Sequence, residues 1–401
     1  MKKQYLRTER THFMCPNMHF GMLMELEKEY EEERVKETLH RMAEAHPFLR
    51  SVVAYEDGTD QLYYKVTEHS QIDLVIRKNK SALWSDYSKL AVQDWNVFEE
   101  GMLKVFVYFE NKQMTLLFVA HHLLADGRGL LELAQEFADV YVGKREPIYV
   151  EEHLIENIGD LPEKSSLTGI SKMLVRRANA TWKKENHTVS YEQYRSFAVK
   201  YGKEHPVEYK TYEADAVQVK QMQEQCREHG FTMNDLLMAH MYITTGASKI
   251  IIASDIRNRL SKYQKGALGN YATALGIVCK TNTKDIVKKA IEVHRAVQKS
   301  KAVNRKWMLV LACYFEMSPT LLDAAAISAL GGFESKAGSF VGKSMFGMGK
   351  AESYSITNLG KVENEDIQSI LFIPPASPAA KLTLGVVTLN GVMRLCSSKN
   401  S

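Results

Sequence analysis

The chain has 401 residues, more than one hydrophobic core usually supports, so its length favours two domains. Hydrophobic residues make up 45% and charged residues 25%, as in soluble globular proteins, and a net charge of +4 gives no indication of nucleic-acid binding. No apolar run approaches the roughly 20 residues that span a bilayer, and no signal peptide is visible. The five cysteines are scattered and form no Cys-x-x-Cys pair, which favours a reducing compartment without disulfides or structural zinc. We therefore expect a cytoplasmic protein with no membrane span, metal or nucleic-acid partner.

The first third of the chain predicts a strand, a helix and then mostly β-structure. Residues 19–26 are strand-like, and apolar residues at helical spacing follow until Pro47, which disfavours helical geometry in the residue before it. The strands expected next are 51–55, 61–66, 72–76, 103–109 and 114–120, with the last two joined as a hairpin through Asn111-Lys112. The last strand leads into two adjacent histidines and then a helix around 130–140.

Residues 143–205 carry less pattern and predict an exposed connection. Within them a basic stretch at 172–184 is interpreted as a charged helix face, with a phosphate-binding patch as the alternative.

The second half again interleaves strands and helices. We expect strands at 208–212, 250–253, 271–278, 354–357, 369–373, 382–389 and 392–396, and helices at 217–226, 234–242, 285–299 and 307–330. The glycine-rich segment 331–349 predicts a mobile loop that gates the site. The pattern indicates an α/β (α+β) protein with two comparable lobes, residues 1–160 and 161–401.

The adjacent histidines His121 and His122 are the first candidates for chemistry. Neighbouring side chains at a strand end point to opposite faces, so one ring can face a cleft while the other is held in the body. Asp126, followed by Gly127, makes a tight turn into the next helix. Further metal ligands at recognisable spacing and a Gly-x-Ser-x-Gly nucleophile elbow are both lacking. The residues alone leave open a structural histidine and a general base.

The run His121-His122-Leu123-Leu124-Ala125-Asp126-Gly127 resembles the His-His-x-x-x-Asp-Gly motif of the condensation-domain and CoA-dependent acyltransferase superfamily, which includes chloramphenicol acetyltransferase. Further segments match that superfamily in the same order. They are 45–51 (Ala-His-Pro-Phe-Leu-Arg-Ser), 98–105, 255–259 (Asp-Ile-Arg-Asn-Arg), 268–271 (Leu-Gly-Asn-Tyr) and 355–360 (Ser-Ile-Thr-Asn-Leu-Gly). The late Asp-Phe-Gly-Trp-Gly element of plant members is missing, and Gly129 stands where a small hydroxyl residue is frequent.

The resemblance implies two chloramphenicol-acetyltransferase-like lobes with an active-site channel at their interface. It implies a thioester-dependent acyltransferase in which His122 is the general base, since a neutral imidazole can take a proton near pH 7. It further implies an ion pair between Asp126 and Arg257, with Arg259 as the alternative partner. His121 then orients the loop. Gly127 belongs to the same turn, and the candidates for contact with the acyl group or donor are Thr357, Asn358 and Asn270.

Three readings of the function stay open at this stage. The donor is acyl-CoA, or it is a phosphopantetheine thioester on a carrier protein, as in a free-standing condensation-type domain. The third reading is a non-catalytic binding relative. In the first two, the thioester is a co-substrate rather than a permanently bound cofactor, and the second substrate is a small-molecule acceptor with a hydroxyl or amine.

Overall fold

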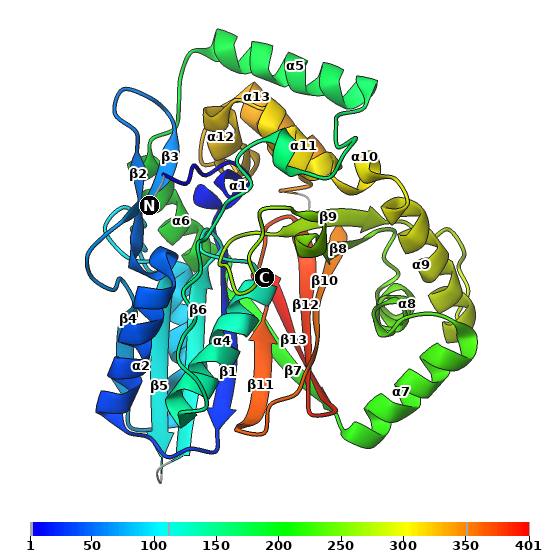
Figure 1. Ribbon diagram of the computed structural model, residues 1–401. Helices are drawn as coiled ribbons and strands as arrows, with labels where there is room; N and C mark the ends of the chain where they lie inside the picture. Colours follow the sequence, from blue (N-terminus) through cyan, green and yellow to red (C-terminus); the bar gives the residue numbers. More distant parts are fainter. Residues whose placement is uncertain (1–2, 111–112, 350–351, 401) are drawn as a thin grey trace.

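A computed structural model describes residues 3–110, 113–349 and 352–400 of the chain. Two sheets of five and six strands lie side by side, and helices cover their outer faces (Figure 1). Strands and helices mix in both lobes, as the sequence predicts. The predicted turn at Asn111-Lys112 lies outside the described residues.

The first sheet has the strand order β11-β1-β6-β5-β4 and carries the histidine pair at one strand end. Its strands are β1 (His19–Leu26), β4 (Asp73–Arg77), β5 (Leu103–Glu110), β6 (Gln113–His121) and β11 (Ile367–Ile373). Two helices, α2 (Glu32–Ala45) and α4 (Gly127–Val142), cover one face of this sheet in Figure 1. Both helices carry an apolar stripe, and that stripe forms much of the core of the first lobe.

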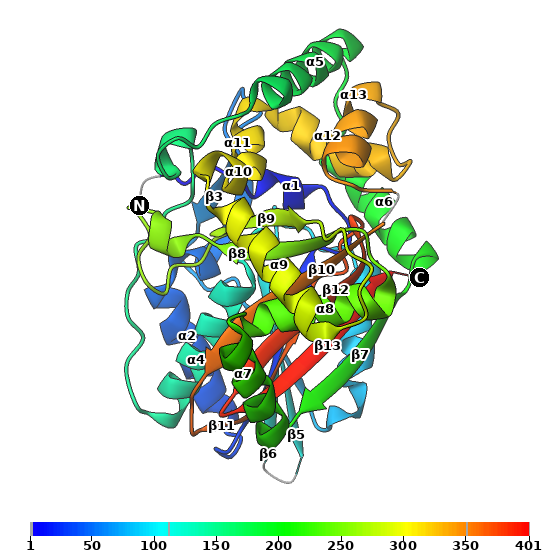
Figure 2. The ribbon, with the colours of Figure 1, turned by 90° about the vertical axis from the view of Figure 1, so that its right-hand side faces the viewer.

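The second sheet has the order β7-β13-β12-β10-β8-β9. Its strands are β7 (Val207–Ala214), β8 (Ile250–Asp255), β9 (Ala272–Ile277), β10 (Ser353–Val362), β12 (Ala380–Leu389) and β13 (Val392–Asn400). The helices of this lobe are α7 (Ala216–His229), α8 (Met233–Thr245) and α9 (Ile286–Lys301), and Figure 2 shows α9 crossing in front of the sheet. Thr232 caps α8 through a reciprocal pair of hydrogen bonds with Asp235.

The smaller elements complete the chain around these sheets. They are α1 (Arg10–Phe13), the hairpin β2 (Ser51–Tyr55) and β3 (Leu62–Val66), α3 (Leu83–Lys89), α5 (Gly169–Glu185) and α6 (Tyr191–Glu204). Single turns of 3-10 helix lie at Pro47–Arg50, Lys80–Ala82, Leu90–Val92, Ile158–Asp160 and Arg257–Arg259. The poorly patterned connection therefore contains two long helices: α5 agrees with the charged helix face expected at 172–184, whereas α6 was not predicted.

The predicted boundary at residue 160 does not separate the two lobes in space. Strand β11, far beyond that boundary, pairs antiparallel with β1 and forms an edge of the first sheet. Helix α6 also packs on the first lobe, where Tyr191 stacks on Phe13 with ring centroids 4.9 Å apart. The chain thus returns to the first lobe beyond the predicted boundary, because these apolar segments find their partners there rather than beside their neighbours in sequence.

The predicted helix 307–330 is broken into three parts. These are α10 (Asn304–Trp307), α11 (Leu309–Glu316) and α12 (Pro319–Ala329), and Pro319 begins the last of them. None of the described helices is by itself long and apolar enough to cross a membrane; α11 and α12 meet that test only as a pair bent by 113°.

The glycine-rich segment 331–349 is not the mobile loop that its composition predicts. It contains α13 (Lys336–Phe340) and one turn of π-helix at Val341–Met345, and it packs against α12. A Cβ atom at Gly338 would collide with Ser328, and one at Gly342 with the backbone of Ala325. Here glycine permits close helix packing, so composition alone misjudged the segment.

Candidate functional site

His122 follows the last residue of β6, at the junction of the two sheets. Its backbone N–H donates to the carbonyl of Met18 (2.8 Å), which fixes the strand end against the segment that precedes β1. Its ring Nδ1 lies 2.9 Å from Oδ1 of Asn270, a residue of the second lobe just before β9. The imidazole therefore faces the opposite lobe, and His122 as a whole residue is half-buried.

The bonds of Asn270 determine which nitrogen of His122 carries the proton. The Asn270 amide nitrogen donates to the carbonyl oxygen of His122 (2.8 Å), so the amide oxygen is the atom that faces Nδ1. An oxygen of this kind only accepts, so Nδ1 carries the hydrogen and donates it. The lone pair of the neutral ring then lies on Nε2. This is the tautomer that a general base requires, because Nε2 is free to take a proton.

Two aromatic rings pack against His122. The ring of His12, from α1, stacks on it with a centroid distance of 4.2 Å and an angle of 16°, and Phe20 of β1 lies 4.9 Å away. Burial lowers the pKa of His122, since it disfavours the charged ring, and it lowers the pKa of His12 well below its usual range, helped by the neighbouring histidines. Both imidazoles are therefore neutral near pH 7.

Asp126 faces away from His122 and holds the turn into α4. Its carboxylate accepts two hydrogen bonds from the Arg257 guanidinium (2.8 and 3.1 Å) and one each from the backbone N–H groups of Gly129 (3.0 Å) and Tyr271 (2.9 Å). Burial opposes ionisation of Asp126, but the charge and hydrogen bonds of Arg257 outweigh it and keep its pKa below the usual value. The predicted partner Arg257 is thus present, whereas the alternative, Arg259, lies over the Trp307 ring.

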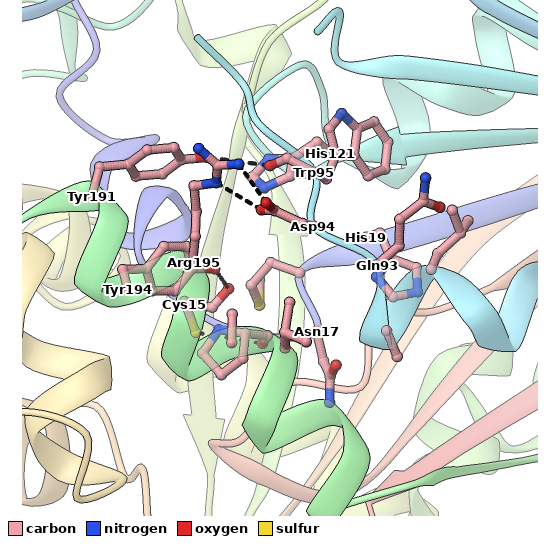
Figure 3. Close-up of a pocket in the computed structure, with 16 residues that line it drawn as sticks. Cys15, Asn17, His19, Gln93, Asp94, Trp95, His121, Tyr191, Tyr194 and Arg195 are labelled. Carbon is pink, nitrogen blue, oxygen red and sulfur yellow. Dashed lines mark hydrogen bonds and ion pairs between the residues drawn. The ribbon is translucent and has the colours of Figure 1, made fainter. Parts of the chain in front are cut away.

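His121 points to the other side of the strand, as expected for neighbouring residues of β-structure. It lines a small cavity of about 50 Å³ together with Asp94 and Arg195 (Figure 3). Its Nδ1 accepts a hydrogen bond from the backbone N–H of Leu123 (3.2 Å), and burial lowers its pKa to about 3. These contacts agree with a role in holding the loop, and the neutral ring faces away from the side on which His122 lies.

Gly127 is required by packing. A Cβ atom at this position would lie 2.9 Å from the Phe372 ring of β11 and 3.1 Å from Leu359 of β10. The side chain of the next residue, Arg128, donates to the carbonyl of Leu359 (2.9 Å). The motif glycine therefore lets the start of α4 contact both β11 and β10 closely.

The candidate residues of β10 lie next to this contact. Thr357 and Asn358 precede Leu359 on the strand, beside an irregularity in its pairing with β12. The Asn358 side-chain oxygen accepts from the backbone N–H of Gly360 (2.9 Å), which leaves the amide nitrogen as a donor. Thus β10 contacts the start of α4 through Leu359, the residue that follows Thr357 and Asn358 on the strand.

Two features of the site were missed by the sequence analysis. Asn270, expected near an acyl group or donor, instead hydrogen-bonds His122 through both ends of its amide. His12 was not identified at all, because a lone histidine near the N-terminus carries no local pattern. The buried ion pair between Arg10 and Asp323 of α12 fixes the short helix that carries His12 (Nε–Oδ1 2.8 Å).

Beside His12 lies a buried carboxyl group that also has no sequence pattern. One oxygen of Glu9 accepts from the Thr8 hydroxyl (2.8 Å), and the other is buried without a hydrogen-bond partner. Burial raises the pKa of Glu9 to about 7. Within the described part of the chain no three His, Cys, Asp or Glu residues gather in a way that could hold a metal.

Comparisons with known proteins agree with this architecture. The epimerization domain from the third module of tyrocidine synthetase B superposes with a TM-score of 0.63 at 12% identity, over 99% of this chain and 91% of its own. The condensation domain of the Monacolin K polyketide synthase MokA gives 0.57 at 12% identity, over 100% and 92%. The wax ester synthase/diacylglycerol acyltransferase from Marinobacter aquaeolei VT8 gives 0.55 at 12% identity, over 99% and 93%.

At such identities the likeness shows the fold, and the reaction has to be argued from the site. No curated protein matches the chain in sequence. The family of condensation domains, in contrast, matches residues 8–305, which is most of the chain and includes the histidine pair, Asp126, Arg257 and Asn270. The chain belongs to the condensation-domain family.

Proposed function

We propose that this protein transfers an acyl group from a thioester to a hydroxyl or amine acceptor, with His122 as the general base. The observation that carries the proposal is the bond between Nδ1 of His122 and Asn270, which leaves the lone pair of the neutral ring on Nε2 of a half-buried histidine between the lobes. A histidine with a purely structural role gains nothing from a fixed tautomer and a lowered pKa. A general base does, because both keep its ring neutral near pH 7 with the lone pair in a defined position.

The reaction needs no covalent acyl-enzyme, because a thioester is already activated. Nε2 of His122 takes the proton of the acceptor as its oxygen or nitrogen attacks the thioester carbonyl. The tetrahedral intermediate then expels the thiolate, which receives the proton from the imidazolium. The amide nitrogen of Asn358 and the hydroxyl of Thr357 are proposed as hydrogen-bond donors to the acyl carbonyl oxygen, where negative charge develops.

The remaining motif residues act on geometry in this proposal. Asp126 and Arg257 neutralise each other at 2.8 Å and are both buried, so neither is available as an acid or base. Asn270 orients the ring of His122, and His121 holds the loop that follows β6. The proton therefore moves only between the acceptor, Nε2 of His122 and the leaving thiolate.

We propose acyl-CoA as the donor and the cytoplasm as the compartment in which the protein acts. The alternative is an acylated phosphopantetheine arm on a carrier protein. Membership of the condensation-domain family supports that alternative. Both donors present the same thioester, so the chemistry assigned to His122 is identical.

Thiol release from acyl-CoA of several chain lengths, with panels of alcohols and amines, tests the proposal. The purified wild type, His122→Ala and the matched surface control His40→Ala are compared, with products identified by mass spectrometry. We expect His122→Ala to lose roughly 10²- to 10⁴-fold in rate, the contribution of a general base, and His40→Ala to be unchanged. Equal rates for the wild type and His122→Ala would refute His122 as the base and favour the alternative that the protein is a non-catalytic binding relative.

The donor is decided by a second comparison. The same acyl group is offered on CoA, on free pantetheine and on a phosphopantetheinylated carrier protein. Preference for CoA over pantetheine supports the donor proposed here. Turnover with the carrier protein alone refutes that donor while keeping His122 as the base.

A further inference from the structure

Helix α5 carries the excess positive charge of the whole chain. It contains five basic residues (Lys172, Arg176, Arg177, Lys183 and Lys184) and one acidic residue, Glu185, which gives an excess of four. The complete chain also has an excess of four, 52 basic against 48 acidic residues. The remainder of the protein is therefore balanced in charge, and α5 is the exception.

The one acidic residue of α5 does not neutralise this charge. The Glu185 carboxylate accepts from the Ser335 hydroxyl (2.6 Å) and from the backbone N–H groups of Lys336 (2.9 Å) and Ala337 (3.1 Å), at the start of α13. In the described part of the chain none of the five basic side chains has an ion-pair partner. Basic residues elsewhere commonly do, such as Lys36 with Glu32.

The exposed face of α5 combines these charges with apolar side chains. At 100° per residue, Met173 and Ala180 lie in the middle of this face. The basic residues lie on both sides of them, with Lys172, Arg176 and Lys183 on one side and Arg177 and Lys184 on the other. Ile170 in the first turn and Met173 are 71% and 61% exposed, which is unusual for side chains of this size.

The opposite face fixes α5 firmly to the body. Val175, Ala178 and Trp182 are buried, and the Trp182 indole N–H donates to the Thr320 hydroxyl of α12 (2.9 Å). The helix forms one extremity of the molecule in two perpendicular views, with no other element beyond it (Figures 1 and 2). A flat surface can therefore reach its exposed face without colliding with the rest of the protein.

We propose that this face of α5, residues 170–184, docks the protein on the surface of an anionic lipid bilayer. Long basic side chains on both sides of exposed apolar ones match a plane of negative headgroups above hydrocarbon. An acidic protein is the weaker match, since protein interfaces are enriched in aromatic residues and depleted in lysine. This face has three lysines and no aromatic residue. Lys183 and Lys184 also complement the negative end of the helix dipole, but the three basic residues of the first half do not.

Co-sedimentation of the full-length protein with vesicles tests the proposal. Vesicles of phosphatidylcholine alone are compared with vesicles containing about 30% phosphatidylglycerol, over a range of salt concentrations. Each basic residue near an anionic surface contributes roughly fivefold to the partition coefficient. We expect binding to the anionic vesicles only, weakened by salt, and a loss of roughly 100-fold in Lys172→Gln/Arg176→Gln/Arg177→Gln.

A matched variant separates the face from total charge. Lys203→Gln/Lys220→Gln/Arg227→Gln removes the same charge from exposed, unpaired positions on α6 and α7 and is expected to bind as the wild type does. Ile170→Ser/Met173→Ser is expected to weaken binding at every salt concentration. Equal loss in both triple variants, or equal binding to neutral and anionic vesicles, would overturn the proposal. So would retention on immobilised polyglutamate without vesicle binding, which would indicate an acidic protein partner.

Discussion

The ion pair between Asp126 and Arg257 allows a quantitative test of whether Asp126 positions the loop or acts in the chemistry. The side chains of Asp126 and Arg257 are 8% and 7% exposed and make two hydrogen bonds to each other. At an effective dielectric constant of 20, unit charges about 4 Å apart attract by about 4 kcal/mol. Removing one partner of a buried pair costs about 3–5 kcal/mol, because the other charge is left uncompensated.

The two single substitutions are expected to differ in cost. Asp126→Asn leaves a buried guanidinium that cannot lose its proton and whose remaining carboxylate partner, Asp255 at 3.2 Å, is half-exposed, so a cost of about 3–4 kcal/mol is expected. Arg257→Met leaves a carboxylate that keeps the N–H groups of Gly129 and Tyr271 and that can take up a proton. Its cost is therefore smaller, and it falls further as the pH is lowered.

The double variant Asp126→Asn/Arg257→Met leaves no buried charge of the pair. We expect it to be more stable than Asp126→Asn alone, with a coupling energy of about 2–3 kcal/mol, measured by urea unfolding followed by tryptophan fluorescence. Its rate of thiol release should exceed that of Asp126→Asn, because the loop regains its position. Additive costs within about 0.5 kcal/mol, or a double variant as inactive as Asp126→Asn, would refute the structural role.

Three further predictions concern the surroundings of the base. Asn270→Leu removes the acceptor that fixes the tautomer of His122 and should lower kcat roughly 10- to 100-fold with little change in KM, as measured by thiol release; an unchanged kcat would contradict this. His12→Ala opens one face of the His122 ring to water, so the pKa of His122 should rise and the acid limb of the pH–rate profile should move to higher pH. The control His12→Phe keeps a stacked ring and should leave the acid limb where it is in the wild type. The pKa of Glu9 is about 7 in the folded protein, above its ordinary value of 4.5. Between these pH values the folded protein therefore binds more protons than the unfolded protein, and its free energy of unfolding falls by about 3 kcal/mol as the pH rises through them. The free energy of unfolding of Glu9→Gln minus that of the wild type should grow by this amount between pH 4.5 and 8, and a constant difference would count against the assignment.

The sequence by itself determined most of the strands and the local arrangement of the motif. Strand and helix periodicities reflect which side chains of a segment are buried, so β5 and β6 were predicted nearly to their ends, and Pro47 predicted the end of α2. The alternation of side chains along a strand also placed His121 and His122 on opposite faces. The pairing of Asp126 with Arg257, 131 residues apart, came from the family resemblance rather than from any local pattern.

Tertiary structure alone decided which distant segments meet at the base. The contacts of Asn270 and His12 with His122 depend on two lobes and a buried ion pair, and no periodicity records such contacts. The same holds for β11, which pairs with β1 in the other lobe. The glycines of 331–349 were misjudged because a glycine that lets helices pack closely and one that loosens a loop are identical in sequence. A local sequence pattern indicates which side chains of a segment are buried, whereas packing over the whole chain determines which other segments they contact.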